Sequence, residues 1–270
     1  QAADLSNTPT TDLTVQLCGD AHLANFGLFN GPDRRLVFDL NDFDETHPGP
    51  FEWDVKRLAA SVAVAGRNNE LSSNKIDRAV RAAVAGYRRT IGTCSERGPL
   101  QVHYFRLELE TIKELTQSQA NKKAKKRFAK MERKATAKDS IRALNKLTDV
   151  VDGRRVIVSD PPLVQRINEL VEPDDVAQLM EFFEGYVSTL PRSRRHVLDR
   201  YSIVEVAHKV VGVGSVGTRC LIVLLESGDG EPLFLQFKEA VASVLEPYTA
   251  PSEFEPGERV VIGQRLTQTL

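Results

Sequence analysis

The chain has 270 residues, of which 41% are hydrophobic and 27% are charged, and its formal net charge is −1. These proportions are those of an ordinary globular protein, and the near-zero charge gives no overall field that would favour nucleic acid or a membrane surface. The three cysteines lie far apart without a CxxC spacing, which argues against a disulfide framework or a zinc knuckle.

No apolar run approaches the roughly 18 residues that a membrane-spanning helix needs. The first residues also lack the basic-then-apolar pattern of a signal peptide. We therefore expect a cytoplasmic protein without a membrane partner. Because the chain begins at Gln1 and ends inside a helical pattern over 257–270, we expect it to be a portion of a longer protein.

The first half of the chain predicts two strands followed by three helices. The strands are expected at 13–18 and 35–40, a rigid loop at His47–Pro50, and the helices at 51–66, 72–94 and 103–118. Residues 122–138 then carry nine Lys or Arg and one Glu. We interpret this segment as a solvated face; a patch for an acidic partner is the alternative, and a nucleic-acid module is not expected because aromatic residues are scarce there.

The second half predicts a hairpin, a helix and then a sheet. Turn residues separate strands expected at 148–151 and 155–158, and a helix is expected at 174–190. Three β-branched and aromatic runs follow at 201–211, 218–225 and 233–237. We predict that they form three adjacent antiparallel strands.

Acidic and amide side chains gather at the ends of the two N-terminal strands. The run G-D-A-H-L-A-N contains Asp20, His22 and Asn25, and the run D-L-N-D-F-D contains Asp39, Asp42 and Asp44. Phosphoryl transfer needs a carboxylate near the attacking hydroxyl and oxygen ligands for Mg²⁺. The pattern therefore indicates a base, Asp20, and metal ligands from Asn25 and from either Asp39 or Asp42. Turn and capping chemistry is the alternative for these aspartates.

A glycine-rich run, G-V-G-S-V-G, contains Gly212, Gly214, Ser215 and Gly217. In a dinucleotide-binding fold such a run opens a helix, whereas here a β-branched, apolar run follows it. A strand, a glycine loop and a second strand are typical of loops whose backbone amides close over ATP phosphates. Lys238 stands 24 residues after Gly214, at the end of the third strand. A hairpin turn and a surface lysine are the alternative.

Both motifs resemble parts of known kinases. The run at 19–25 resembles the G-D-x-H-x-x-N catalytic loop of the aminoglycoside and choline phosphotransferase branch of protein-kinase-like enzymes. The D-F-D run at 42–44, with Gly49-Pro50 and Trp53-Asp54 after it, is similar to the metal-binding run and the later aromatic-Asp of that branch. The runs 39–45, 49–60, 210–219 and 234–240 resemble, over most of the chain, a bacterial family of uncharacterised proteins.

The kinase resemblance implies an ATP- and Mg²⁺-dependent phosphotransferase. Its acceptor would be an unknown hydroxyl on a small molecule or a protein. The roles implied are Asp20 as base, His22 as a loop-shaping residue, Lys238 with Gly212, Gly214, Ser215 and Gly217 on the nucleotide, Asn25, Asp42 and Asp44 on Mg²⁺, and Asp54 as support for the catalytic loop. The glutamate that would pair with Lys238 is Glu258 or Glu246.

The two motifs stand in reversed order, because kinases place the glycine loop and its lysine before the catalytic loop. The resemblance therefore implies an α+β, protein-kinase-like fold of two lobes in permuted sequence order. Segment 1–66 would be the catalytic-loop and metal-binding part of the C-lobe-like region, and 67–200 its helical part. Segment 201–270 would be the N-lobe-like glycine-loop sheet, incomplete at its C-terminus.

Two other functions fit parts of the pattern. A nucleotide-binding regulatory module without catalysis would keep the fold and the glycine loop. A metal-dependent phosphohydrolase would use Asp20 and His22 as a D-x-H pair. Such hydrolases also need later Asn-His and His-x-His ligands, which this sequence lacks.

Overall fold

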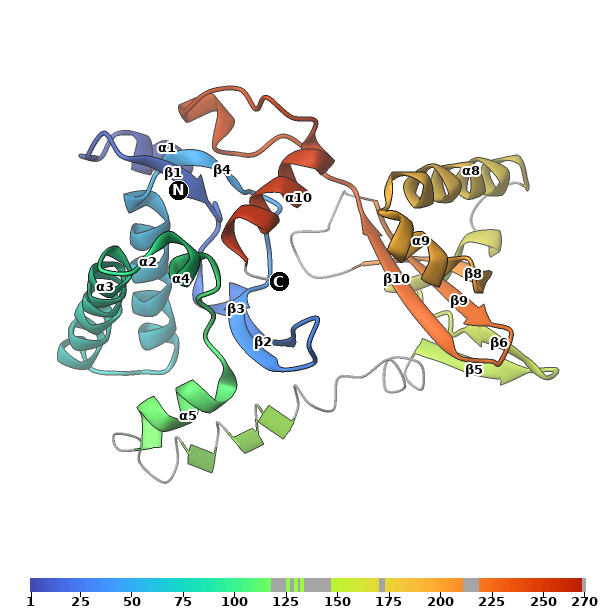
Figure 1. Cartoon of the computed structure of the whole chain (residues 1–270), viewed down its shortest axis with the longest axis horizontal. Coiled ribbons are helices and arrows are strands. Elements are labelled where there is room, and N and C mark those ends of the chain that lie inside the picture. Colours follow the sequence, from blue (N-terminus) through green and yellow to red (C-terminus); the bar gives the residue numbers. More distant parts are fainter. Residues whose placement is uncertain are drawn as a thin grey trace. The chain divides into compact units, whose positions relative to one another are not determined.

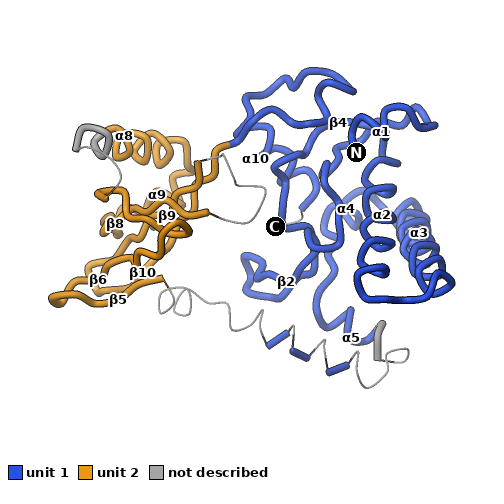
Figure 2. Tube along the Cα trace, turned by 180° about the vertical axis from the view of Figure 1, so that it is seen from behind, with its two compact units in different colours: residues 1–135, 240–270 blue, residues 136–239 orange. Residues whose placement is uncertain are grey.

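The computed structural model describes residues 1–117, 125–126, 129–130, 132–133, 147–169, 173–210 and 219–268. The chain divides into two compact units, shown in Figure 2. Unit 1 combines residues 1–135 with residues 240–270, and unit 2 consists of residues 136–239. The fold class is α+β, with helices and small antiparallel sheets.

Two short antiparallel sheets of unit 1 position the polar motifs of the N-terminal region. Strand β1 (Thr14–Leu17) pairs with β4 (His47–Pro50), so that Leu17 lies opposite His47. Strand β2 (Phe26–Asn30) pairs with β3 (Leu36–Leu40) in a hairpin. The short helix η1 (Leu23–Asn25) lies between β1 and β2. The run 18–25 therefore follows one strand and the run 41–46 follows another.

Helices surround these sheets in unit 1. Their bounds are α1 Ala2–Ser6, α2 Glu52–Asn68, α3 Ser73–Ser95, α4 Pro99–His103 and α5 Leu109–Gln117. Helices α2 and α3 lie side by side (Figure 1), and a side chain at Gly66 would come within 2.8 Å of Ile76. The buried core beside β1 consists of Leu17, Trp53 and Leu245, with Leu5 packed against it.

The C-terminal part of the chain completes unit 1. After unit 2 the chain forms η4 (Glu246–Tyr248) and α10 (Pro256–Thr267). Helix α10 packs so closely on the residues before β4 that a side chain at Gly263 would meet Thr46 at 2.3 Å. The segment 240–268 therefore belongs with β1 to β4, although 189 residues (51–239) separate the two parts of the sequence.

Unit 2 contains a four-stranded antiparallel sheet in the order β10-β9-β8-β7. The strands are β7 Val164–Arg166, β8 Tyr201–Lys209, β9 Cys220–Ser227 and β10 Pro232–Lys238. A separate hairpin joins β5 (Thr148–Val151) to β6 (Arg154–Ile157). The predicted adjacent strands β8, β9 and β10 and the predicted β5–β6 hairpin are confirmed.

Apolar side chains cover both faces of the unit 2 sheet. One cluster contains Ile157, Val164, Ala207, Ile222 and Leu224. On β10, Phe237 contacts the rings of Phe182, Phe183 and Tyr186 on α8 (Pro173–Thr189). The remaining helices of this unit among the described residues are η2 (Ile167–Glu169) and α9 (Arg192–Leu198).

Several local predictions differ from the structure. His47–Pro50, predicted as a loop, is strand β4; its two prolines lack N–H groups, and β4 pairs with β1 in a two-stranded sheet. The helix predicted at 103–118 is interrupted, since α4 ends at His103 and α5 begins at Leu109. The compact units also part at 135 and 239, whereas the predicted segments part at 66 and 200. The boundary at 239 arises because residues of the segment 240–268 form hydrogen bonds with the run 40–46.

Candidate functional site

The loop after β1 is held by one carboxylate of helix α2. Asp54 Oδ2 accepts a hydrogen bond from the backbone N–H of Cys18 at 2.7 Å, and Oδ1 accepts one from the N–H of Gly19 at 3.1 Å. Gly19 has φ +87°, and a side chain there would meet the carbonyl oxygen of Glu45 at 2.1 Å, so the turn requires glycine. Asp54 thereby fixes the direction in which the chain enters Asp20.

Asp20 forms an ion pair with a second residue of the same helix. Its Oδ1 lies 2.5 Å from Nε of Arg57, three positions after Asp54 and thus on the same face of α2. Its Oδ2 lies 3.5 Å from Nε2 of His22. The Nδ1 atom of His22 accepts the N–H of Ala24 at 3.1 Å, which orients the ring toward Asp20. The structure therefore brings Asp20 and His22 together as neighbours.

Asn25 is oriented toward the same loop. Its Nδ2 donates to the backbone carbonyl of Asp20 at 2.7 Å, and the carbonyl of Asn25 accepts the N–H of Asn41 at 2.8 Å. The amide nitrogen is engaged by the loop, and the side-chain oxygen is the atom that can ligate a cation. Asn25 thus links the 18–25 loop to the start of the 41–46 run.

The run 41–46 meets the Asp20 loop at Cys18. The Cys18 thiol donates to the carbonyl of Asp42 at 3.8 Å, and Oδ1 of Asp42 accepts the N–H of Asp44 at 3.1 Å. Burial and the nearby carboxylates of Asp54, Asp20 and Asp42 raise the pKa of Cys18 to about 12. One buried thiol therefore lies within the electrostatic reach of three of the predicted site carboxylates.

Asp39, the alternative metal ligand, lies three residues before Asp42, on β3. It faces Gly27 across the β2–β3 hairpin, and its Oδ1 accepts the N–H of Leu40 at 2.8 Å. Burial raises the pKa of Asp39, as it raises that of Asp54, where the charge of Asp20 adds to the effect. The contact with the Cys18 thiol is made by Asp42.

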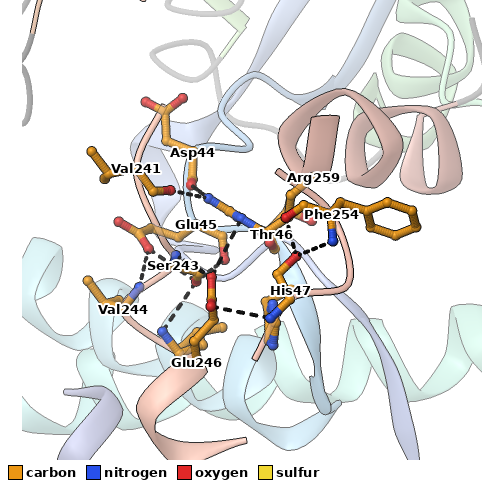
Figure 3. A network of polar contacts seen from close by, with 12 residues as sticks. Asp44, Glu45, Thr46, His47, Val241, Ser243, Val244, Glu246, Phe254 and Arg259 are labelled. Carbon is orange, nitrogen blue, oxygen red and sulfur yellow. Dashed lines mark hydrogen bonds and ion pairs between the residues drawn. The ribbon is translucent and has the colours of Figure 1, made fainter. Parts of the chain in front are cut away.

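A buried arginine holds the run 41–46 from the side of α10 (Figure 3). Arg259 is 2% exposed and donates from Nη2 to the carbonyls of Asp44 and Val241, each at 2.8 Å, and from Nη1 to the carbonyl of Thr46. Its Nε lies 4.0 Å from Oε1 of Glu246. A single cation thus fixes three backbone carbonyls that lie up to 215 positions away in the sequence.

Glu45 and Glu246 complete this network. The Glu45 carboxylate accepts the N–H of Val244 at 2.8 Å, and Ser243 Oγ donates to the Glu45 carbonyl at 2.9 Å. Glu246 accepts the N–H groups of Ser243 at 2.9 Å and Ser252 at 3.2 Å. Hydrogen bonding from Ser243 holds the pKa of Glu246 below its ordinary value. Figure 3 shows these residues around the run 44–47. We call the run 44–46, together with Ser243, Glu246 and Arg259, the α10 clamp.

The C-terminal predictions fall in different places. Gly212, Gly214, Ser215 and Gly217 lie outside the described residues. Lys238 ends β10 opposite Cys220, the first residue of β9. The flanking residues of the glycine run, Lys209 at the end of β8 and Arg219 before β9, thus belong to the same end of the sheet as Lys238. Glu258 is exposed on α10 in unit 1, and Glu246 is bonded within the α10 clamp.

The metal prediction rests on few protein ligands. Within the described ranges, no group of three or more His, Cys, Asp or Glu side chains is arranged to hold a metal ion. Magnesium in nucleotide sites is commonly held by one or two carboxylates together with phosphate oxygens and waters. Asn25 and Asp42 fit that smaller demand by residue type, since each carries a side-chain oxygen: Asn25 bonds the backbone of Asp20 through its Nδ2, and Oδ1 of Asp42 accepts the N–H of Asp44, which is itself exposed.

A cavity of about 230 Å³ reaches Asp20. Its lining includes Gly19, Asp20 and Arg57, together with Trp53 and Leu245 from the core. The cavity is too small for a nucleotide but has the dimensions of a compact organic group. Asp20 therefore lies at the edge of a space that a small molecule can enter.

A family model for a group described as uncharacterized protein conserved in bacteria (DUF2252) matches residues 1–270. The chain belongs to this bacterial family. No curated protein and no solved structure matches it. In the part of this family member that the structure describes, no helix has the length and apolar character to cross a membrane.

Two charged residues of this family member were missed at the sequence level. Arg57 carried a usable signal, because the spacing D-x-x-R from Asp54 places both residues on one helical face. Arg259 carried none, since a lone arginine in an amphipathic helix is usually solvated. Its burial follows from the docking of α10 on the run 44–46, a long-range contact that no local pattern encodes.

Proposed function

We propose that this protein is an ATP- and Mg²⁺-dependent phosphotransferase with a protein-kinase-like fold in permuted order. Unit 1 would be the C-lobe-like part and unit 2 the N-lobe-like part. The observation that supports the proposal best is the double hydrogen bond from Cys18 and Gly19 to Asp54. It presents Asp20 and Asn25 from one rigid loop, at the point where that loop meets Asp42.

In the proposed reaction the acceptor hydroxyl attacks the γ-phosphorus of ATP. A new oxygen–phosphorus bond forms, the bond from the γ-phosphorus to the bridging oxygen breaks, and ADP leaves. The hydroxyl proton goes to Oδ2 of Asp20, since Oδ1 is paired with Arg57. Asn25 and Asp42 would hold Mg²⁺, and the ion would supply positive charge opposite the phosphates. Lys238 and the glycine run would position the nucleotide.

The cavity beside Asp20 favours a small acceptor over a protein side chain. Its volume of about 230 Å³ and its lining by Trp53 and Leu245 suit a compact molecule with an apolar portion. Asp20 and Arg57 at its edge would orient a hydroxyl. A small alcohol is therefore the substrate class that this geometry supports.

The test is thermal unfolding with and without Mg-ATP. Binding to the native state at 100 times Kd stabilises it by about 2.7 kcal/mol. We expect the Mg²⁺-dependent shift in the wild-type protein and its loss in both Asp42→Asn and Lys238→Met. We expect Asp20→Asn to keep the shift while ADP release with small alcohols falls.

Matched controls are Asp12→Asn and Lys75→Met, which make the same changes at exposed positions. Both should retain the full shift. Absence of any shift in the wild-type protein would refute the nucleotide site. A shift that persists in Asp42→Asn would remove this residue from the metal ligands.

The ion pair between Asp20 and Arg57 at 2.5 Å favours one alternative. A base that is already paired at one oxygen also suits a nucleotide-binding regulatory module without catalysis. That module would show the Mg-ATP shift, and its dependence on Asp42 and Lys238, without ADP release under any acceptor condition. The two readouts, binding and turnover, therefore separate the two functions.

A further inference from the structure

The apolar wall of the cavity beside Asp20 comes from two parts of unit 1. Trp53 and Leu245 belong to the buried core and are 4% and 3% exposed, so packing within the core fixes their positions. Ala2 and Leu5 of helix α1 line the same cavity, and both pack against that core. The cavity is therefore bounded by the core and by one short helix.

Helix α1 reaches the cavity through these two side chains. Ala2 and Leu5 are three positions apart, so they share one helical face, and both are half-buried. The side chains at positions 3, 4 and 6 of the helix are exposed. Because Leu5 is the larger of the two lining residues, its side chain is the part of α1 that occupies the most volume at the cavity wall.

Helix α2 holds this wall in place. Nζ of Lys56 donates to Oγ1 of Thr8 at 2.6 Å and to the carbonyl of Pro9 at 3.0 Å. Thr8 in turn donates to the carbonyl of Leu5, from Oγ1 at 2.7 Å and from its backbone N–H at 2.9 Å. A chain of hydrogen bonds therefore runs from Lys56 through Thr8 to the backbone of Leu5.

The same helix also holds the predicted base. Asp54 and Arg57 of α2 bond the loop and the carboxylate of Asp20. Thr11 donates to Oε1 of Glu52 from its N–H at 2.6 Å and from Oγ1 at 2.8 Å, which attaches the segment between α1 and β1 to α2 as well. Because the carboxylate and the wall are both attached to α2, their separation is fixed, and it limits the size of a molecule that fits between them.

We propose that Leu5 sets the size of the acceptor alcohol and that Lys56 is a positioning residue for this wall. The inference rests on the proposed function, which makes the cavity an acceptor site. An alcohol whose hydroxyl lies at Asp20 directs its apolar part toward Trp53 and Leu5, which line the cavity of about 230 Å³. A single aromatic ring suits this space, whereas a branched group on the far side of the ring meets the Leu5 side chain.

The test compares benzyl alcohol with 4-isopropylbenzyl alcohol, which carries the group that Leu5→Ala removes. Affinities are measured by ligand-observed NMR titration of the full chain without nucleotide or magnesium. The wild-type protein is expected to bind benzyl alcohol at least about tenfold more tightly, because an apolar pocket discriminates by such factors against added carbon groups. Leu5→Ala should reverse the preference, since the vacated volume accepts the isopropyl group.

Lys56→Met tests the positioning role. It removes the bonds to Thr8 and Pro9 that hold the wall. The wild-type preference for benzyl alcohol should fall at least about threefold, a factor that corresponds to the loss of one hydrogen bond. A preference equal to that of the wild-type protein would show that Lys56 does not position the wall.

Leu100→Ala is the matched control, since it removes the same group at a position that is 71% exposed and outside the cavity lining, and it should keep the wild-type preference. If Leu5→Ala fails to fold, Ala2→Leu decides: it adds volume at the same wall and should weaken benzyl alcohol binding at least about tenfold. An unchanged preference in Leu5→Ala, or no binding of either alcohol to the wild-type protein, would overturn the inference.

ADP release with the same two alcohols and Mg-ATP separates this inference from the proposed function. A preference that reverses in binding, with no ADP release in the presence of either alcohol, would refute the phosphotransfer but support the role of Leu5. ADP release that keeps the wild-type order of the two alcohols in Leu5→Ala would support the phosphotransfer and refute the role of Leu5.

Discussion

Different interactions stabilise the Asp20 loop of unit 1 and the β7–β10 sheet of unit 2. In the loop, the carboxylate of Asp54 bonds the backbone of residues 18 and 19, and the guanidinium of Arg259 bonds the run that contacts them. In the sheet, Leu224 and its neighbours form an apolar cluster between strands that are adjacent in sequence. Polar geometry therefore organises the candidate site, and burial of apolar area organises the sheet.

This difference has a consequence for how each region responds to substitution. A hydrogen-bonded network fails when one group is removed, because its partners stay buried without compensation. An apolar cluster loses free energy in proportion to the volume removed. Substitutions in unit 1 should therefore change local geometry sharply, whereas those in unit 2 should lower stability in a graded way.

Among the substitutions in the polar network of unit 1, Arg259→Met should have the largest effect on stability. It leaves three backbone carbonyls and Glu246 without their cation, and removal of one partner of a buried pair costs about 3–5 kcal/mol. Urea unfolding measures the loss. Arg265→Met, at an exposed position of the same helix, is the control and should change stability by less than about 0.5 kcal/mol. Equal effects of the two changes would contradict the α10 clamp.

Leu224→Ala tests the apolar cluster of the unit 2 sheet. Leu224 is 0% exposed in the unit 2 cluster, and its truncation should lower the free energy of unfolding by about 3 kcal/mol. Leu163→Ala, at a position that is 53% exposed, should cost far less. Hydrogen exchange read by mass spectrometry should show faster exchange in β8 to β10. If protection fell first in the Asp20 loop instead, the two regions would not be stabilised separately.

Local patterns predicted three of the four strands of the unit 2 sheet and missed the three-residue strand β7. Strands β8, β9 and β10 follow from runs of β-branched residues, and the β5–β6 hairpin follows from the Asp152-Gly153 turn. Such elements pair with neighbours in sequence, so turn chemistry determines most of their topology. Helices α2 and α3 were likewise predicted to within two residues at each end.

The candidate site of unit 1 was predicted in part. The residues Asp20, Asn25, Asp42 and Asp54 were chosen from motif spacing; the structure places Asp20, Asp42 and Asp54 near Cys18 and bonds Asn25 to the backbone carbonyl of Asp20. Strand β4 was missed because prolines usually exclude a strand. Arg259 was missed because its partners lie 213 to 215 positions away, beyond the reach of any periodicity. The use of Lys238 and the glycine run together with Asp20 stays a prediction.

Asp54→Asn tests the two hydrogen bonds that anchor the Asp20 loop to helix α2. The amide replaces one carboxylate oxygen with an N–H donor, which then faces a backbone N–H of Cys18 or Gly19. The loss of one acceptor should cost about 1–3 kcal/mol and speed exchange of these two amides. Asp77→Asn on α3 removes an exposed ion pair with Arg81 and serves as control, with an effect below about 0.5 kcal/mol. Unchanged exchange at residues 18 and 19 would refute the anchoring role.

The smallest expected effect is a pH dependence of the α10 clamp. Hydrogen bonding from Ser243 lowers the pKa of Glu246 below the ordinary value for a glutamate. A lowered carboxyl pKa adds stability above the unfolded-state pKa, and that stability is lost as the pH falls through the folded-state pKa. The difference in Tm between wild type and Glu246→Gln should therefore be constant above about pH 5.5 and shrink as the pH falls below 4.5. Glu258→Gln makes the same change at an exposed position of α10 and is the matched control. All other carboxylates are present in both proteins, so their contributions cancel in the Tm difference. A Tm difference that widened in acid would show that the clamp does not hold Glu246 ionised.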